Sequence, residues 1–325
     1  MARNNNKTLI IILVVLLGFF ALLQINNKKK ESTLRRDLVD IDTAKVTAVY
    51  LYPQADKGKE LLFRRTDKGW TISNEGKEAP VEPSTMRRLL GAIKEIRPQQ
   101  LVAVGKEKWS EYHVDDSLAT RVRVMEGKKE KVSLYIGKFT VERPSGNNPY
   151  AYGGRNVSGK SYVRAEGDDA VYAVEGFLPM TFNQGFDAWR NSQFVEINRS
   201  RINRITFTYP ADSGYVLHND STGWHWRLEN VKPDSVAMNK YLSTISYRRY
   251  NRFADDFKPS GEALFTITIE GKDMQPVVLK AYSDERYHLV LHSSQNPETY
   301  FADKDSTIFH TFFLPRSHFE AKESS

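Results

Sequence analysis

The sequence predicts an α+β protein in which an N-terminal transmembrane helix is followed by two similar lobes, an internal repeat. Each lobe is expected to be an antiparallel sheet with a covering helix. An uncharged, apolar run opens the chain, and two proline-led amphipathic helices follow it. Alternating strands joined by short turns surround each helix, a pattern typical of antiparallel sheets. With 325 residues, 40% of them hydrophobic, the chain is long enough for about two packed domains.

The segment 8–25 is long enough to span a bilayer. Its 17 residues from Leu9 to Ile25 carry no charge, and as a helix they extend about 26 Å, near the thickness of the hydrocarbon core. Basic residues before the run also fit a cleaved signal peptide, which remains the alternative. However, the run ends in bulky residues such as Phe20 and Leu23, whereas cleavage requires small ones. We therefore predict an uncleaved anchor in the cytoplasmic membrane.

The basic charge of the protein lies beside this segment. The net charge is +7, but residues 1–36 hold seven Lys or Arg and one acid, which leaves 40 bases and 39 acids elsewhere. A nearly neutral remainder argues against nucleic-acid binding. The basic cluster at 28–36 favours keeping the following chain in the cytoplasm, yet long domains can cross a membrane regardless of flanking charge. Charge alone leaves the orientation open.

The chain contains no cysteine. This excludes disulfides, thiolate metal sites, cysteine nucleophiles and a lipid-modified cysteine anchor. Because both cytoplasmic and exported proteins can lack cysteine, the absence does not decide the compartment.

The first lobe begins with an alternating strand whose positions Val46, Ala48 and Tyr50 we predict to face the core. A second strand is expected to end at Gly69-Trp70. A helix led by Pro83 follows, in which apolar residues recur at i, i+3, i+4 and i+7. Its predicted core positions are Met86, Leu89, Leu90 and Ile93. Further strands are expected at 121–125, 132–136, 162–163 and 171–174.

The second lobe repeats this order. Ile205, Phe207 and Tyr209 alternate, a strand is expected to end at Gly223-Trp224, and a helix led by Pro233 follows. Its predicted core positions are Met238, Tyr241, Leu242 and Ile245. Strands are then expected at 264–269, 277–282, 288–292 and 299–301. The repeated order favours one structural plan present twice.

These patterns divide the chain into six parts. The predicted parts are a short tail (1–7), a transmembrane anchor (8–25), a polar tether (26–42), a first α+β lobe (43–176), a connector (177–200) and a second α+β lobe (201–325).

Several short motifs together resemble a known family. They are the N-terminal anchor, Lys45-Val46-Thr47, Gly69-Trp70, the Pro83 helix, Tyr162-Val163-Arg164, Val171-Tyr172-Ala173-Val174 and Trp189-Arg190. The set is similar to the DUF-4340 family, a bacterial domain of unknown function, over about residues 8–325 and in two copies. Such proteins tend to be encoded beside ABC-transporter components, including those of gliding-type systems. The resemblance implies an envelope protein whose lobes lie on the periplasmic side, and it transfers no catalytic residue.

One motif formally matches a phosphate-binding loop. Gly154 to Ser161 fits G-x-x-x-x-G-K-[ST], but such a loop requires a buried strand before it and a helix after it. The preceding residues are polar, and Tyr162 to Ala165 alternate like a strand. We therefore interpret the segment as a glycine-rich hairpin loop and predict no nucleotide cofactor.

Other candidate chemical groups favour structural roles. His288 and His292 would suit a metal on a helix, but in a strand four residues span about 13 Å, too far for direct chelation of one ion. Three acid pairs, 115–116, 168–169 and 255–256, could suggest glycoside hydrolysis, yet all lie in turn-like contexts. We expect no metal, no cofactor and no enzymatic activity.

Two groups of residues are candidates for binding a partner or ligand. The first is the polar loop containing Asn147, Asn148, Tyr150 and Tyr152, because loops of this composition make adaptable contact surfaces. The second is Trp226, which shares a strand face with Trp224. A position in the core or at the interface between the lobes is the alternative for this tryptophan pair.

The function expected from these observations is non-catalytic. We predict a membrane-anchored accessory or scaffold protein of a bacterial envelope complex, associated with ABC-transporter subunits or a gliding-type system. The anchor would hold the lobes close to the lipid bilayer and raise their effective concentration toward membrane partners. The alternative is an extracytoplasmic ligand-binding module for polysaccharide or peptide.

Overall fold

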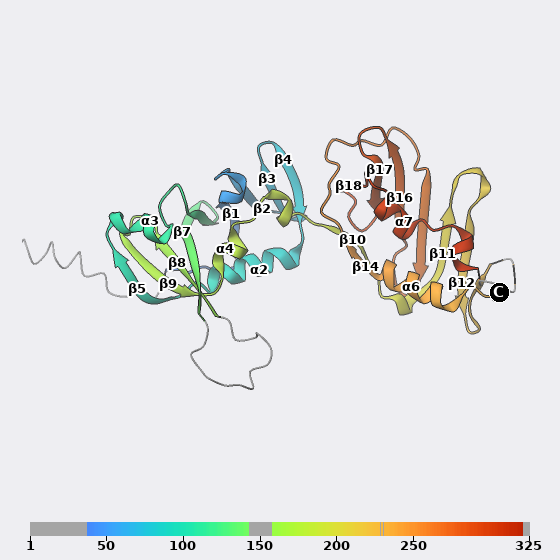
Figure 1. Cartoon of the computed structure of the whole chain (residues 1–325), viewed down its shortest axis with the longest axis horizontal. Helices are drawn as coiled ribbons and strands as arrows, with labels where there is room; N and C mark the ends of the chain where they lie inside the picture. The colour runs from blue at the N-terminus through green and yellow to red at the C-terminus, as the bar shows by residue number, and fades with distance from the viewer. Residues whose placement is uncertain (1–37, 143–157, 228, 230, 321–325) are drawn as a thin grey trace, which may run out of the picture. The chain divides into compact units, whose positions relative to one another are not determined.

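A computed structural model describes residues 38–142, 158–227, 229 and 231–320 (Figure 1). The fold is α+β and consists mainly of antiparallel sheets with a few helices, as predicted. The chain divides into two compact units. The first comprises residues 1–77 and 83–186, and the second comprises residues 78–82 and 187–325.

The first unit contributes eight strands to a nine-stranded sheet, and the ninth strand (Lys77–Val81) falls almost entirely within the segment 78–82. The strands of this sheet in chain order are β1 (Val46–Tyr52), β2 (Leu61–Thr66), β3 (Gly69–Asn74), β4 (Lys77–Val81), β5 (Pro98–Val104), β6 (Thr120–Glu126), β7 (Lys129–Glu142), β8 (Ser158–Ala165) and β9 (Ala170–Glu175). Their order in the sheet is β4-β3-β2-β1-β6-β7-β8-β9-β5. In this sheet order, every neighbouring pair from β3-β2 to β9-β5 is antiparallel. The edge strand β5, which pairs with β9, is an element that the sequence analysis did not predict.

One long helix contributes an apolar face to the core of this unit. Helix α2 (Pro83–Lys94) begins at the predicted proline, and its four predicted core side chains are all buried. The buried residues of the sheet include Val49 and Leu51 in β1 and Val122 and Val124 in β6. The shorter helices are η1 (Gln54–Asp56), η2 (Lys106–Lys108), α3 (Trp109–Tyr112) and α4 (Leu178–Phe182).

The register of β1 differs from the prediction. Val46 pairs with Glu126 and Ala48 with Met125, so β1 contains a bulge at Thr47. A bulge adds one residue and shifts every later side chain to the other face of the sheet. Val49 and Leu51 are therefore buried, and the prediction that Ala48 and Tyr50 face the core is wrong.

The Gly-Trp pairs also lie elsewhere than predicted. Gly69 and Gly223 begin the third strand of their sheets rather than ending the second. Both glycines have positive φ, 124° and 102°, in tight turns where a side chain would be strained. Each predicted strand is thus a hairpin of two strands.

The second unit contains a seven-stranded sheet. Its strands are β11 (Ile202–Thr208), β12 (Tyr215–Asp220), β13 (Gly223–Trp226), β15 (Phe265–Gly271), β16 (Val277–Asp284), β17 (His288–Ser293) and β18 (Tyr300–Ala302). Their order is β13-β12-β11-β15-β16-β17-β18, and every neighbouring pair is antiparallel. A separate two-stranded sheet joins β10 (Gln193–Glu196) to β14 (Tyr247–Arg249).

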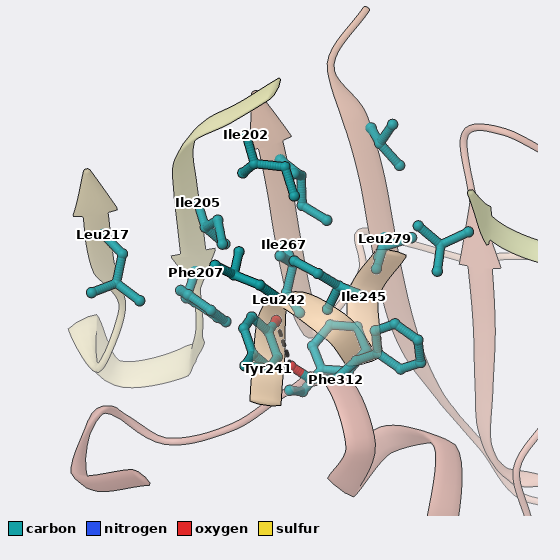
Figure 2. Packing of buried hydrophobic residues seen from close by; sticks show 14 of the residues in the cluster. Ile202, Ile205, Phe207, Leu217, Tyr241, Leu242, Ile245, Ile267, Leu279 and Phe312 are labelled. Atoms are coloured by element: carbon teal, nitrogen blue, oxygen red, sulfur yellow. Dashed lines mark hydrogen bonds between the residues drawn. The ribbon is translucent and has the colours of Figure 1, made fainter. Parts of the chain in front are cut away.

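Helix α6 (Ser235–Ser246) packs its apolar face into the core of this unit. Its four predicted core residues are all buried, and they lie among side chains from β11, β15 and β16 (Figure 2). The buried hydroxyl of Tyr241 donates a 3.0 Å hydrogen bond to the carbonyl of Phe312 in α7 (Thr307–Phe312). Asp234 caps the start of α6 by accepting from the Ala237 amide at 2.7 Å. The helix therefore begins one residue after its cap, and Pro233 precedes both.

Other short elements complete the second unit. They are α5 (Phe186–Trp189), whose Phe186 is the last residue of the first unit, η3 (Arg199–Arg201), η4 (Pro210–Asp212) and η5 (Arg316–Phe319). The edge strand β18 is covered by a neighbouring segment, because Ala254 donates to Tyr300 and Ala302 donates to Arg252. An edge covered in this way has fewer backbone groups free to pair with another chain.

The predicted anchor, tether and tail fall almost entirely outside the described residues, which begin at Leu38. Within the residues that the structure does describe, no helix has the length and apolar character to cross a membrane.

Candidate functional site

Of the predicted binding residues, the structure describes Trp226 but not the four in the polar loop. Asn147, Asn148, Tyr150 and Tyr152 lie in the segment 143–157, outside the described residues. Trp226 is described: it lies in β13, is 3% exposed and belongs to the core of the second unit. The core alternative for this tryptophan is therefore the one observed.

A cavity of about 300 Å³ lies beside Trp226. One wall is Arg316, whose guanidinium stacks 4.6 Å from the centre of the indole ring. Arg316 also bonds both carboxylate oxygens of Glu229 at 2.9 and 2.7 Å. Tyr215 packs against the indole with ring centres 5.6 Å apart. Because its own neighbours cover the ring, Trp226 stabilises the fold and does not offer a stacking surface to solvent.

The two arginines that carry the family resemblance are both buried. Arg164 in β8 is 3% exposed, and Arg190, directly after α5, is 8% exposed. A buried guanidinium requires hydrogen bonds and counter-charges, because its desolvation is otherwise very costly. Acids that looked like catalytic pairs in the sequence supply these partners.

Arg164 lies between two aromatic rings of the first unit. Its guanidinium carbon is 3.7 Å from the centre of the Trp109 ring and 3.8 Å from that of Tyr135. Nε donates to the carbonyl of Val114 at 3.0 Å, and Nη2 contacts Asp116 at 3.3 Å. This arrangement fixes α3 to the sheet and gives Asp116 a structural role.

Arg190 forms an equivalent centre in the second unit. Its guanidinium lies 3.7 Å from the centre of the Phe253 ring. It donates to both carboxylate oxygens of Asp255, at 3.0 and 2.6 Å, and to Asp187 at 3.2 Å. The adjacent acid Asp256 instead pairs with an exposed arginine, Arg286.

The remaining motifs also have structural neighbours. Asp168 accepts from the Ala170 amide at 2.9 Å and from the Tyr172 hydroxyl at 3.1 Å, so it organises a turn. Strand β8 contains the predicted strand at 162–165, but it begins at Ser158, so the last four residues of the phosphate-loop match are strand and not the predicted hairpin loop. His288 and His292 both lie in β17, also as predicted. Among the described residues, no group of three or more His, Asp or Glu side chains could hold a metal ion.

The strongest candidate surface was not predicted. Across four adjacent strands of the first sheet, arginine and tyrosine alternate as direct cross-strand partners. Tyr52 pairs with Arg121, Arg121 with Tyr135, and Tyr135 with Arg164, while Tyr50 pairs with Arg123 in the next row. We call this surface the arginine–tyrosine face; its members are Tyr50, Tyr52, Arg121, Arg123, Tyr135 and Arg164. In β1 and β6 these side chains lie on the opposite side of the strands from the buried valines and leucine, since successive side chains alternate, and they are partly exposed, whereas Tyr135 and Arg164 are buried.

Cation–π contacts join the members of the arginine–tyrosine face. Arg123 lies 5.2 Å from the ring centre of Tyr50, and Arg121 lies 5.9 Å from Tyr52 and 5.5 Å from Tyr135. Such contacts contribute about 0.5–1 kcal/mol each at exposed sites. These contacts therefore fix the arginine and tyrosine side chains in the ligand-free protein.

Each exposed arginine of this face has a carboxylate partner. Arg121 bonds Glu166 at 2.6 and 2.7 Å, and Arg123 bonds Glu130 at 2.7 Å. The Tyr52 hydroxyl donates to Glu60 at 2.6 Å. The surface is consequently polar and aromatic but close to electrically neutral.

Burial and these neighbours shift the protonation of the face. Burial, assisted by the Glu60 carboxylate, raises the pKa of Tyr52, and burial raises the pKa of Tyr135. Hydrogen bonds with Tyr52 and Glu130 raise the pKa of Arg123. At neutral pH Tyr52 and Tyr135 are therefore hydroxyl groups and Arg123 is a cation, so these side chains can donate hydrogen bonds.

The signal for this face was present in the sequence. Arg121 and Arg123 alternate with Val122 and Val124, which identifies them as the solvent-facing side of β6. The cross-strand pairing of these arginines with Tyr50 and Tyr52 on one face depends on the bulge at Thr47. No residue type in the sequence predicts that bulge. Without that bulge the tyrosines would face the core.

The fold defines an α+β protein with two sheet-based units. A family comparison identifies it further: the chain belongs to the family described as domain of unknown function (DUF4340), whose profile matches residues 70–264, more than half of the chain. The match is one continuous stretch that begins in β3 and ends before β15. No curated protein and no solved structure matches the chain.

Proposed function

We propose that this protein is a membrane-anchored, non-catalytic accessory or scaffold protein of a bacterial envelope complex, associated with an ABC transporter or a gliding-type system. The anchor is the segment 8–25, and the two units lie on the periplasmic side. The observation that carries the proposal is the uncharged run from Leu9 to Ile25 placed before two packed sheet units. Membership of the DUF4340 family supports it through the envelope setting that the resemblance implies.

The side-chain chemistry of the described residues supports a binding role. Asp116 and Asp255, members of two of the acid pairs, are engaged by the buried arginines Arg164 and Arg190. The arginine–tyrosine face instead supplies residue types that are enriched in binding surfaces. A protein held at the membrane with such a face increases the local concentration of whatever it binds.

We also infer that the two units are copies of one plan. The order β3-β2-β1-β6-β7-β8-β9 corresponds to β13-β12-β11-β15-β16-β17-β18. Helices α2 and α6 occupy the same place in that order, because α2 lies in the chain between β3 and β6 and α6 lies between the corresponding strands β13 and β15. A bulge near the start of the first strand, in β1 and in β11, supports the correspondence.

The absence of cysteine allows a clean test of anchoring and orientation. Lys68→Cys places a thiol in the exposed β2–β3 turn, and Asn5→Cys places one in the predicted tail. In cells with a permeabilised outer membrane, a membrane-impermeant maleimide should label Lys68→Cys at once. Asn5→Cys should react only after the inner membrane is lysed. Labelling in the opposite order would contradict the proposed orientation, and recovery of the chain in the soluble fraction would contradict the anchor.

A second candidate function is ligand binding outside the cytoplasm. The specific observation that favours it is the ordered row of hydrogen-bonding groups on the arginine–tyrosine face. Polysaccharide and peptide are both compatible with such a row in general terms. Saturable binding of a defined ligand by the purified full chain would separate this function from scaffolding.

A further inference from the structure

The arginine–tyrosine face has the geometry of a platform. Its main row crosses four strands at right angles, from Tyr52 through Arg121 and Tyr135 to Arg164. Neighbouring strands lie about 4.8 Å apart, which is similar to the length of one pyranose unit in an extended glycan. At one end of the row Trp109 stacks on Arg164. At the other end the Tyr52 hydroxyl donates a hydrogen bond to Glu60.

The arginine–tyrosine face carries both hydrogen-bond donors and hydrogen-bond acceptors, and they are closely spaced. Arg121 and Arg123 each have five guanidinium N–H bonds, and the carboxylates of Glu130 and Glu166 occupy only some of them. Each carboxylate retains free lone pairs for further acceptance. A sugar hydroxyl is donor and acceptor at once, so it can bond an arginine and its paired carboxylate together.

The paired charges of the arginine–tyrosine face favour neutral ligands over polyanions. Arg121, Arg123 and Arg164 are matched by Glu166, Glu130 and Asp116, so the platform offers no net field for a polyanion. Nucleic acids and acidic polymers draw their affinity mainly from unpaired cations. Apolar peptide side chains would cover charged groups without replacing their hydration, which is unfavourable.

We propose that the arginine–tyrosine face binds a neutral glycan, with sugar units lying over its partly exposed residues Tyr50, Tyr52, Arg121 and Arg123. This inference rests on the second candidate function and names its ligand class and site. The partly exposed side chains of Arg121 and Arg123 (31% and 29% exposed) supply donors to the sugar. Because cation–π and ionic contacts already fix them, little side-chain entropy is lost on binding.

The test uses the full-length chain in phosphatidylcholine nanodiscs. Binding is measured to a linear mannan, a β-glucan and a dextran, with heparin as the polyanion. We expect at least one neutral polymer to bind saturably and heparin to bind more weakly. Arg123→Gln and Tyr50→Leu should each weaken that binding about tenfold or more, as expected for a central contact. Arg123→Lys retains the charge but loses the planar donor set, so it should bind with intermediate affinity.

Arg204→Gln is the matched control. Arg204 lies in β11 of the second unit, is 37% exposed and pairs with Glu270 at 3.8 Å, so it is a half-exposed sheet arginine with an acidic partner. Its loss should change glycan affinity by less than about twofold. The proposal is overturned if no neutral polymer binds, if heparin is preferred, or if Arg123→Gln and Arg204→Gln behave alike. Loss of a co-purifying protein with Arg123→Gln, without glycan binding, would instead identify a protein interface. Membrane anchoring and partner recovery are measured separately, so failure here leaves the accessory role standing.

Discussion

The guanidinium of Arg164 lies 3.8 Å from the ring centre of Tyr135, its direct cross-strand partner. Tyr135 in turn faces Arg121, so the buried end of the arginine–tyrosine face and its exposed part share one tyrosine. A structural feature of the family motif Tyr162-Val163-Arg164 thus positions the candidate binding surface.

Replacing Arg164 by lysine should destabilise the first unit. Lysine keeps the charge but cannot stack between Trp109 and Tyr135 or donate in the same geometry to Val114. We expect a loss of about 2–3 kcal/mol in the free energy of unfolding. The measurement is denaturant unfolding followed by circular dichroism. Arg64→Lys, at an exposed position of β2, should change stability by less than about 0.5 kcal/mol; equal effects would refute the structural role of Arg164.

The adjacent acids 255 and 256 should respond very differently to the same substitution. Asp255→Asn removes the counter-charge of the buried Arg190 and should cost about 3 kcal/mol. Asp256→Asn breaks only an exposed pair with Arg286, for which about 0.5 kcal/mol or less is expected. Calorimetric melting of both variants checks the contrast. A comparable shift in the two would show that Arg190 is not the centre described here.

The cap of helix α6 can be tested in isolation. Asp234→Ala leaves the Ala237 amide without its side-chain acceptor and should lower stability by about 1 kcal/mol. Ser235→Ala, one residue later and exposed, changes composition without removing a cap bond and should be close to neutral. Chemical denaturation of the pair measures the difference, and a neutral Asp234→Ala would contradict the capping geometry.

His292 should make the second unit less stable at mildly acidic pH. Burial lowers the pKa of His292, helped by nearby Lys280, although the bond to the carbonyl of Pro297 at 3.1 Å opposes the shift. The unfolded imidazole titrates at about 6.5, so the unfolded chain binds the proton first as pH falls. The stabilising contribution is therefore present above about pH 6.5 and is lost as pH decreases through the lower folded pKa.

The variant His292→Gln retains a donor for Pro297 but does not titrate. Its stability should vary less between pH 7 and 5 than that of the unchanged chain, as measured by thermal melting across this range. The exposed His318→Gln should retain the original dependence. Identical pH profiles for all three proteins would show that His292 does not couple protonation to folding.

Local patterns correctly predicted an α+β fold with antiparallel sheets and both long helices. In α2 and α6 the apolar spacing determined all eight buried positions, because one helix face must meet the sheet. Strand faces were harder to predict. The alternation in β11 correctly predicted that Ile205 and Phe207 are buried. The same pattern predicted the wrong buried face in β1, because that strand contains a bulge, which depends on pairing with a distant strand.

The candidate site was less predictable than the fold. Arg164 and Arg190 could be recognised as family features, but their stacking partners come from residues far away in sequence. Trp226 looked like a binding residue, because exposure of an aromatic side chain cannot be read from its type alone. Strand β5 was missed since its alternation is interrupted by two bulges against β9.

The accessory or scaffold role can be tested by affinity purification of the full-length tagged chain from gently solubilised membranes, followed by quantitative mass spectrometry. We expect the chain to be recovered from the membrane fraction together with transporter or other envelope subunits in stoichiometric amounts. Recovery of the chain alone, under conditions that preserve known membrane complexes, would contradict its role as an accessory or scaffold protein.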